Sequence, residues 1–323
     1  MKKAILLTVI ITTILLGLIG CSSNTSAKSP TIGIIQYVEH VALDSAREGF
    51  VKALADNGFV DGKNLTIDAQ NAQADQSNLS TISDRFVSNK VDLVLAIATP
   101  AAQAIAGKTK DIPILGTAIT DYVAAKLVDS NEVPGGNVSG TTDMNPIKEQ
   151  IDLLVKLVPD AKTVGVIYTS SEDNSIVQAK IAKEAIEALG LAYTEVTITN
   201  SNDVQQATQT IVQKCDALYL PTDNVLASSI PVIHGVALQS KTPVICGESG
   251  MVKNGGLATL GINYYDLGYK TGLMALKILR GEAKTATMPI ESADGFDFAI
   301  NGTVAKEIGL KIPEDLKEYI IEQ

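Results

Sequence analysis

The sequence predicts an α/β protein built as two doubly wound parallel-sheet lobes joined by a multi-strand hinge. Three observations lead to this fold class. A nearly continuous apolar run at residues 92–98 leads directly into a helical pattern at 99–106, as expected where a strand buried on both faces opens into a helix. Strand and helix patterns alternate along the chain, and the alternation occurs a second time in the same order.

The first lobe is predicted from the alternation in residues 31–117. Strands are expected at 31–36, 65–70, 92–98 and 112–117, and helices at about 41–57, 78–89 and 99–106. Thr99 is a candidate N-cap, and Pro100 would occupy the first helical position, where its missing N–H is not needed. This order implies a parallel sheet with right-handed crossovers.

The second lobe repeats that order. Strands are expected at 163–168, 193–199, 216–223 and 242–247, and helices at 175–189 and 204–214. Each element follows its counterpart by about 130 residues, which indicates a structural duplication. Because ligands of such folds bind at the carboxyl ends of parallel strands, the strand ends near Thr99 and Asp223 predict a cleft between the lobes.

The remaining segments predict the hinge. Residues 131–140 are dense in turn-forming residues and are the first candidate hinge. They are followed by a strand at 256–262, a helix at about 265–279, extended segments at 288–290 and 296–300, and helices at 302–308 and 313–322. This tail is too short for a third domain but can cross between the lobes. We therefore expect one lobe from 31–140 with about 264–290, and the other from 141–263 with about 291–323.

The N-terminus has the pattern of an export signal. Lys2 and Lys3 precede an apolar run at residues 4–19, which is too short for a comfortable membrane span. The run ends in Leu-Ile-Gly-Cys21, which resembles the bacterial lipobox and implies cleavage before Cys21 and lipidation of its thiol. Residues 1–20 are thus predicted to be a lipoprotein signal peptide and residues 21–30 a flexible tether. We expect an exported chain, lipid-anchored to the outer face of the cytoplasmic membrane.

Composition narrows the function classes. The formal net charge of −10 argues against nucleic acid as a partner, and the absence of Trp argues against an aromatic carbohydrate platform. Cys215 and Cys246 have no metal-site spacing and are expected to be free thiols. The sequence contains no GxSxG, HExxH, P-loop or GxGxxG motif, so we expect a protein that is not an enzyme and that holds no cofactor or metal.

Eight short segments together resemble one family of binding proteins. They are YVEHVALD at 37–44, REGF at 47–50, ATPAAQ at 98–103, AITD at 118–121, YTSSEDNS at 168–175, PTDN at 221–224, GESG at 247–250 and GINYYDLG at 261–268. With the lipobox and the duplicated lobes, they are similar to ABC-transporter substrate-binding lipoproteins of the tryptophan/tyrosine-binding (TrpX) family. That resemblance implies the type I periplasmic-binding fold and an extracytoplasmic monomer that closes on an aromatic amino acid (Trp, Tyr or Phe) and meets the permease subunits of an importer.

Other functions remain open at this point. The same fold could serve as a ligand sensor for a membrane kinase, or could bind another small metabolite such as a nucleoside. A surface enzyme acting on a small metabolite is an alternative from a different class. Genes for a permease and an ATPase beside this one, or for a kinase, would separate transport from sensing.

The candidate ligand contacts follow predicted strand ends. The chain has three arginines, all on predicted helices, so a ligand carboxylate would need hydroxyl and helix N–H groups. Candidates for it are Thr99 with Ala101, and Ser170 and Ser171 with Asn174. Candidate acceptors for an ammonium are Asp121, Asp223 and Glu248, and further candidate contacts are Asn224 and Thr117. Tyr37 and Tyr168 could face each other across a ring.

Each candidate contact also has a plainer explanation. Thr99, Asp223, Asn224 and Glu248 can simply begin helices. Asp121 can form a turn, and the two tyrosines can belong to the core.

Overall fold

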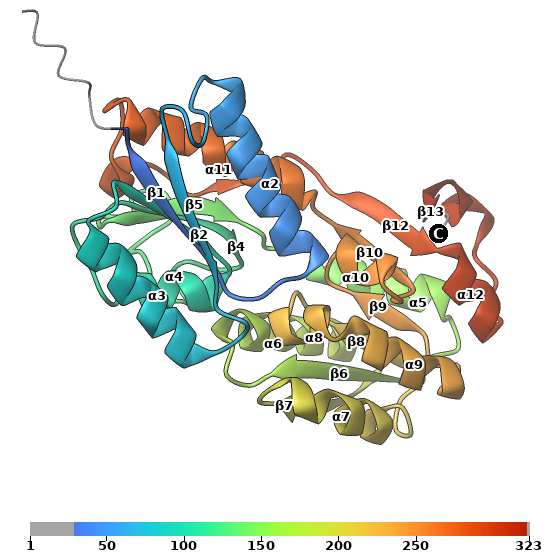
Figure 1. The fold of residues 1–323 in the computed structure, drawn as a ribbon. Helices are drawn as coiled ribbons and strands as arrows, with labels where there is room; N and C mark the ends of the chain where they lie inside the picture. The colour runs from blue at the N-terminus through green and yellow to red at the C-terminus, as the bar shows by residue number, and fades with distance from the viewer. Residues whose placement is uncertain (1–28, 322–323) are drawn as a thin grey trace, which may run out of the picture.

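The structure, a computed structural model, describes residues 29–321; the predicted signal peptide, Cys21 and most of the predicted tether lie outside these residues. Two α/β lobes lie next to each other, each built on one central sheet (Figure 1). The strand order is β11-β5-β4-β3-β1-β2 in the first sheet and β13-β12-β10-β9-β8-β6-β7 in the second. Within residues 29–321, no helix has both the length and the apolar character needed to cross a membrane.

The first lobe alternates strands and helices as the sequence predicts. Its strands are all parallel: β1 (Thr31–Gln36), β2 (Thr66–Asn71), β3 (Leu93–Ile97), β4 (Ile114–Ile119), β5 (Val138–Thr142) and the short β11 (Glu291–Ser292). Helix α2 (Val41–Asp56) packs against α11 (Tyr264–Leu279), and α3 (Gln76–Asn89) packs against α4 (Thr99–Ala106). All four helices contribute apolar residues to the same core as the sheet. Every residue of β3 and β4 is therefore buried.

The second lobe confirms the duplication. Its strands β6 (Thr163–Thr169), β7 (Ala192–Ile198), β8 (Ala217–Leu220), β9 (Val244–Cys246) and β10 (Ala258–Gly261) take the same order as β1 to β5. Its helices are α5 (Ile147–Leu157), α6 (Asp173–Ala188), α7 (Val204–Ile211), α8 (Asn224–Ser228), α9 (Ile230–Ser240), α10 (Ser249–Lys253) and α12 (Gly302–Ile308). The repeated order gives the two sheets equivalent carboxyl ends.

The tail departs from the sequence prediction in one element. The second sheet is parallel as predicted except for β12 (Asp297–Asn301), the extended segment near 296–300, which runs antiparallel to β10. The helix expected at 313–322 is a 3₁₀ helix (Glu314–Tyr319) followed by β13 (Ile320–Ile321), which pairs with β12. The β-branched pair at 320–321 favours this edge strand, and the Phe298 and Tyr319 rings pack with their centroids 4.7 Å apart.

Three segments cross between the lobes: 143–146, 262–263 and 293–296. The hinge predicted at 131–140 is therefore wrong, since these residues lead into β5, which belongs to the first sheet. Side chains tie two of the crossings together. Tyr264 donates its hydroxyl proton to Asp143 (2.7 Å), and the Ile262 N–H donates to Asn145 Oδ1 (3.1 Å).

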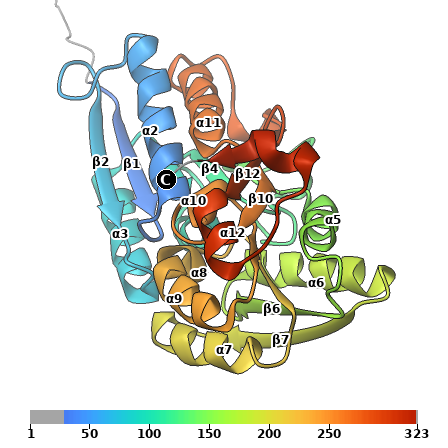
Figure 2. The same cartoon turned by 90° about the vertical axis from the view of Figure 1, so that its right-hand side faces the viewer.

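Glycines allow α2 and α11 to approach very closely, and Figures 1 and 2 both place these helices side by side. A Cβ atom on Gly49 would lie 2.0 Å from the Tyr265 carbonyl oxygen, and one on Gly268 would lie 1.9 Å from the Ala46 carbonyl oxygen. Any larger residue would push the helices apart. The first turns of both helices therefore form one continuous wall of the first lobe at the cleft.

Candidate functional site

A narrow cavity lies between the lobes, where the carboxyl ends of the two sheets face each other. The lobes are so close together here that the free volume of the cavity is only about 10 Å³, room for about one water molecule. The first lobe and the crossings line it with His40, Leu43, Ala118, Thr120, Asp143 and Tyr264; the second lobe lines it with Asn174, Thr222, Asp223, Asn224, Ala227 and Glu248. Because each lobe supplies half of the wall, rotation at the hinge would open the cavity.

The structure brings four of the sequence candidates to this cavity: Asn174, Asp223, Asn224 and Glu248, all buried. Asp223 is the N-cap of α8, and its carboxylate accepts hydrogen bonds from the Leu226 N–H (2.9 Å) and from Thr169. Glu248 is the N-cap of α10 and accepts from the N–H groups of the next turn. Both acids thus fill the plainer capping role and line the cavity as well.

Glu172 is the main residue that sequence reasoning missed. It directly precedes α6 and is 1% exposed. Its Oε2 accepts hydrogen bonds from Asn174 Nδ2 (3.1 Å), the Asn224 N–H (3.3 Å) and Asn224 Nδ2. Its Oε1 has no hydrogen-bond partner, and neither has Asn174 Oδ1. Two buried acceptors without partners beside a cavity are unusual, since such groups are normally satisfied.

Thr120, Thr222 and Gln178 were also missed, although they hold the cavity floor together. Gln178 is fully buried on α6, and its Oε1 accepts from the Thr222 N–H (3.1 Å) and the Thr222 hydroxyl (2.7 Å). Its Nε2 donates to the carbonyls of Asn174 and Thr222 and, across the cleft, to Thr120 Oγ1 (3.4 Å). Its spacing from Asn174 on one helix face was the signal that could have found it.

Burial dominates the electrostatics of the site. Burial, and then the charge of Asp223, raise the pKa of the Glu172 carboxyl. Burial also raises the pKa of Glu248 to about 7 and lowers that of His40 to about 4, so the His40 imidazole is neutral at neutral pH. No lysine or arginine is among the described residues that line the cavity.

Four further candidates lie in the first lobe, behind the lining. Thr99 is not an N-cap: α4 begins at Thr99 itself, after Ala98 at φ 80°, because the chain turns directly out of β3. The Thr99 hydroxyl is buried without a partner, and Ala101, two residues further along α4, is also buried. Thr117 accepts a hydrogen bond from Thr141 (3.2 Å). Tyr37 is buried close enough to Glu172 that this charge helps to raise the pKa of its phenol.

The structure does not bring the other four candidates to the cavity. Asp121 is a turn residue whose Oδ1 accepts from the N–H groups of residues 123 and 124. Ser170 and Ser171 are exposed, and Ser170 donates to the Ile198 carbonyl. Tyr168 lies beside Glu195 on the neighbouring strand, so the expected pair with Tyr37 does not form.

A one-residue register error explains the tyrosine prediction. Counted from the equivalent strand starts Thr31 and Thr163, Tyr37 corresponds to Thr169 and not to Tyr168. Because strand side chains alternate between faces, a shift of one residue turns the side chain to the other face.

Hydrogen bonds across the cleft show that the lobes are closed. Gln103 on α4 donates to Asp173 on α6 (2.8 Å), and His40 Nε2 lies 3.5 Å from Asn224 Oδ1. Together with the contact between Gln178 and Thr120, these bonds join the lobes at three points.

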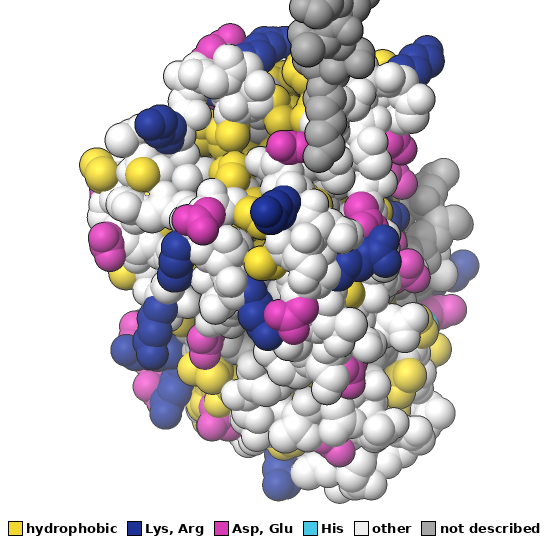
Figure 3. Space-filling model, turned by 60° about the vertical axis from the view of Figure 1, so that its left-hand side comes forward, with side chains coloured by type: hydrophobic (Ala, Val, Ile, Leu, Met, Phe, Trp, Pro, Cys, Tyr) yellow, Lys and Arg dark blue, Asp and Glu magenta, His cyan; other side chains and the backbone are white. Residues whose placement is uncertain are grey.

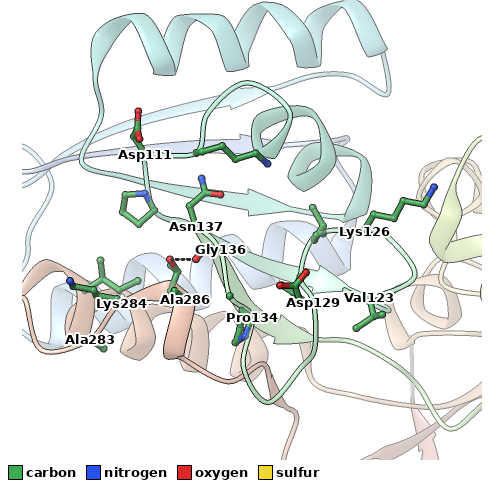
Figure 4. A pocket seen from close by; sticks show the side chains of 17 residues that line it. Asp111, Val123, Lys126, Asp129, Pro134, Gly136, Asn137, Ala283, Lys284 and Ala286 are labelled. Carbon is green, nitrogen blue, oxygen red and sulfur yellow. Dashed lines mark hydrogen bonds between the residues drawn. The ribbon is translucent and has the colours of Figure 1, made fainter.

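A larger hollow lies on the outside of the first lobe, between the loop before β5 and the segment after α11 (Figure 4). It is open to solvent and has no wall from the second lobe, so hinge motion would not enclose a ligand there.

On the face shown in Figure 3, basic side chains are interspersed with acidic ones. Within residues 29–321, no group of three or more His, Cys, Asp or Glu side chains could hold a metal ion. Cys215 and Cys246, also in this part of the chain, are free thiols.

Comparisons with known proteins agree with this two-lobe site. The family model described as "ABC transporter substrate binding protein" matches residues 31–322. A "Tyrosine-binding protein" of Clostridioides difficile (strain R20291) is 43% identical over 316 residues, which cover 94% of this chain and 91% of that protein.

Two solved structures relate the chain to a liganded and an open state. The structure of an ABC domain from Streptococcus pneumonia in complex with L-Trp has a TM-score of 0.88 at 38% identity, and the match covers 91% of this chain and 100% of that one. The ligand-free, open structure of a Clostridium difficile substrate binding protein has a TM-score of 0.69 at 48% identity, with 91% and 99% covered. The chain therefore has the lobe arrangement of a liganded relative, although its sequence is nearer to that of the open one.

Proposed function

Because the chain belongs to the family of ABC transporter substrate binding proteins and has the type I periplasmic-binding fold, we propose that it binds an aromatic amino acid between its lobes and delivers it to the permease of an importer. Tyrosine and tryptophan are the foremost candidates, since one relative carries tyrosine in its name and another was solved with L-Trp. The family is one of extracytoplasmic binding proteins and not a class of enzymes.

The observation that carries the proposal is the pair of buried acceptors without partners, Glu172 Oε1 and Asn174 Oδ1. Burying an acceptor without a hydrogen bond costs about 1–3 kcal/mol, more for a charged group. The α-ammonium of an amino acid supplies three N–H donors and a positive charge, which meets both needs. A neutral sugar or nucleoside would supply donors but no charge.

The first lobe offers complementary groups for the rest of the ligand. The unpartnered Thr99 hydroxyl stands at the start of α4, whose first N–H groups have no partner within the helix, and these groups suit a carboxylate. Leu43 and Ala227 give the cavity apolar walls from the two lobes, where an aromatic ring would pack. Tyr37 is the candidate ring contact that remains beside the acid pair.

Isothermal titration calorimetry with L-Tyr, L-Trp, L-Phe and adenosine tests the proposal. We expect saturable binding of at least one aromatic amino acid and no heat with adenosine. Binding of adenosine alone would refute the proposal. Mass spectrometry of the ligand that co-purifies with the native protein gives an independent answer, and an intact ligand after long incubation would argue against the enzyme alternative.

We also propose that the protein acts as a monomer and is held at the membrane by lipid on Cys21, after removal of residues 1–20. The lipobox-like Leu-Ile-Gly-Cys sequence supports this anchoring. Fractionation of cells that express wild type or Cys21→Ala tests it: the wild type should sediment with membranes, whereas the variant should not carry lipid. A wild-type protein with an unmodified Cys21 would contradict the proposal. Light scattering would test the monomer.

A further inference from the structure

Glu172 and Asp223 form a pair of buried carboxyl groups in the second lobe, each 1% exposed. Asp223 lines the cavity, and Glu172 lies directly behind Asn174 and Asn224, which line it. Both stand at the beginning of α8: Asp223 caps it, and Glu172 accepts from the first N–H of the helix, that of Asn224. Two negative charges so close together and so deeply buried are costly unless a cation or a proton is present.

No described residue lining the cavity supplies that cation. The ionisable groups that face the pair or line the same cavity come from five elements: Tyr37 after β1, His40 before α2, Asp143 in the first crossing, Glu248 before α10, and Tyr264 at the start of α11. His40 is neutral at neutral pH, and the other four are neutral or acidic. A proton must therefore balance the pair when no ligand is bound.

Hydrogen bonds indicate which acid holds the proton. Asp223 accepts from two backbone N–H groups, those of Thr169 (2.6 Å) and Leu226 (2.9 Å), and from the Thr169 hydroxyl (2.9 Å), all of which stabilise its ionised form. Glu172 receives all its donors on Oε2, and its Oε1 has none. Burial and the Asp223 charge both raise the pKa of Glu172, in agreement with a proton on this residue.

We propose that ligand binding is coupled to proton release, because the ligand ammonium takes the place of the proton on Glu172. This inference rests on the proposed function, since it requires a cationic amine. In the exchange the Glu172 O–H bond breaks, the proton passes to solvent or buffer, and the carboxylate forms an ion pair with the ammonium. No other covalent bond changes. The net charge of Glu172 and Asp223 with the bound ammonium equals that of the protonated Glu172 and ionised Asp223 without it.

Calorimetry on the wild-type protein tests the coupling without any variant. L-Tyr or L-Trp is titrated at pH 7 in phosphate and in Tris, whose ionisation enthalpies differ strongly. We expect the observed enthalpy to depend on the buffer, with a slope of about one proton released per ligand, and the affinity to rise by up to about tenfold per pH unit across neutral pH. Equal enthalpies in both buffers would overturn the inference and leave the proposed function intact. No binding of any aromatic amino acid would instead remove the proposed function.

Matched variants assign the proton to Glu172. In Glu172→Gln we expect a folded protein whose remaining binding heat is the same in both buffers, since an amide carries no proton to release. The control is Glu184→Gln, the same substitution at an exposed position of the same helix, and it should keep the wild-type slope. A proton release that persists in Glu172→Gln would overturn the assignment, because the proton would then come from another group of the cavity.

Discussion

The hydrogen bonds of Gln178 allow a quantitative prediction for the substitution Gln178→Met. Methionine keeps the length and lack of branching of glutamine, so the packing term is small and the polar contacts are what is lost. The Thr222 N–H and hydroxyl both lose their acceptor, the Oε1 atom of a fully buried side chain. At about 1–3 kcal/mol for each of the two buried unsatisfied groups, the variant should lose about 2–6 kcal/mol of unfolding free energy. That is a large share of the roughly 5–15 kcal/mol of a typical domain.

Urea unfolding of the ligand-free protein, followed by circular dichroism, measures this loss. The matched control is Gln205→Met at an exposed position of α7, where we expect a change within about 0.5 kcal/mol. We also expect weaker ligand binding in the Gln178 variant, because Gln178 positions the loop that carries Asp223 and Asn224. A loss below about 1 kcal/mol would refute the reasoning, since it would mean that water or a rearranged loop satisfies Thr222.

Three further predictions concern folding, closure and pH. Gly140→Ala should prevent stable folding, measured as loss of soluble protein, because its φ is 144° and a Cβ would lie 2.0 Å from a main-chain oxygen of β4. Gln103→Ala removes an exposed bond across the cleft and a bond to the Ala125 carbonyl within the first lobe, so stopped-flow release of ligand should become a few-fold faster with only a small loss of stability. The unfolding free energy of the ligand-free protein should fall between pH 6.5 and 8, since Glu172 and Glu248 keep protons that the unfolded chain has released, and this contribution is lost as the pH rises through their folded pKa values. His40 acts in the opposite direction only below about pH 6.5, so a rise in stability over the upper window would contradict the assignment.

Local sequence patterns predicted the lobes well, because the alternation of strands and helices along the chain is enough to indicate a parallel sheet. The apolar run at β3 and its repeat at β8 place the sheet centres, and the constant offset places the second lobe. The tail was less predictable. β12 pairs with β10 only after the chain has passed through α11 and β11 of the first lobe, so no local sequence pattern sets its antiparallel direction.

The site was predictable where a residue ends a strand and begins a helix, as Asp223 and Glu248 do. Glu172 has the same position before α6 but was not among the predicted contacts, because its partner Asn224 meets it only through tertiary structure. The prediction for Tyr168 was wrong for a different reason. The offset between the two repeats was known only approximately from the sequence, so a one-residue shift in strand register could not be detected.

The glycine contact between α2 and α11 has a mechanical consequence. α11 starts immediately after the crossing at 262–263, and α2 starts with the residues that meet the second lobe at the cleft. At Gly49 and Gly268 the main chains of the two helices are in direct contact, so no side chain at these points can change rotamer and let the helices shift. We therefore expect α2 and α11 to move together as one rigid unit. A small rotation at the crossing would then displace the start of α2 relative to the second lobe.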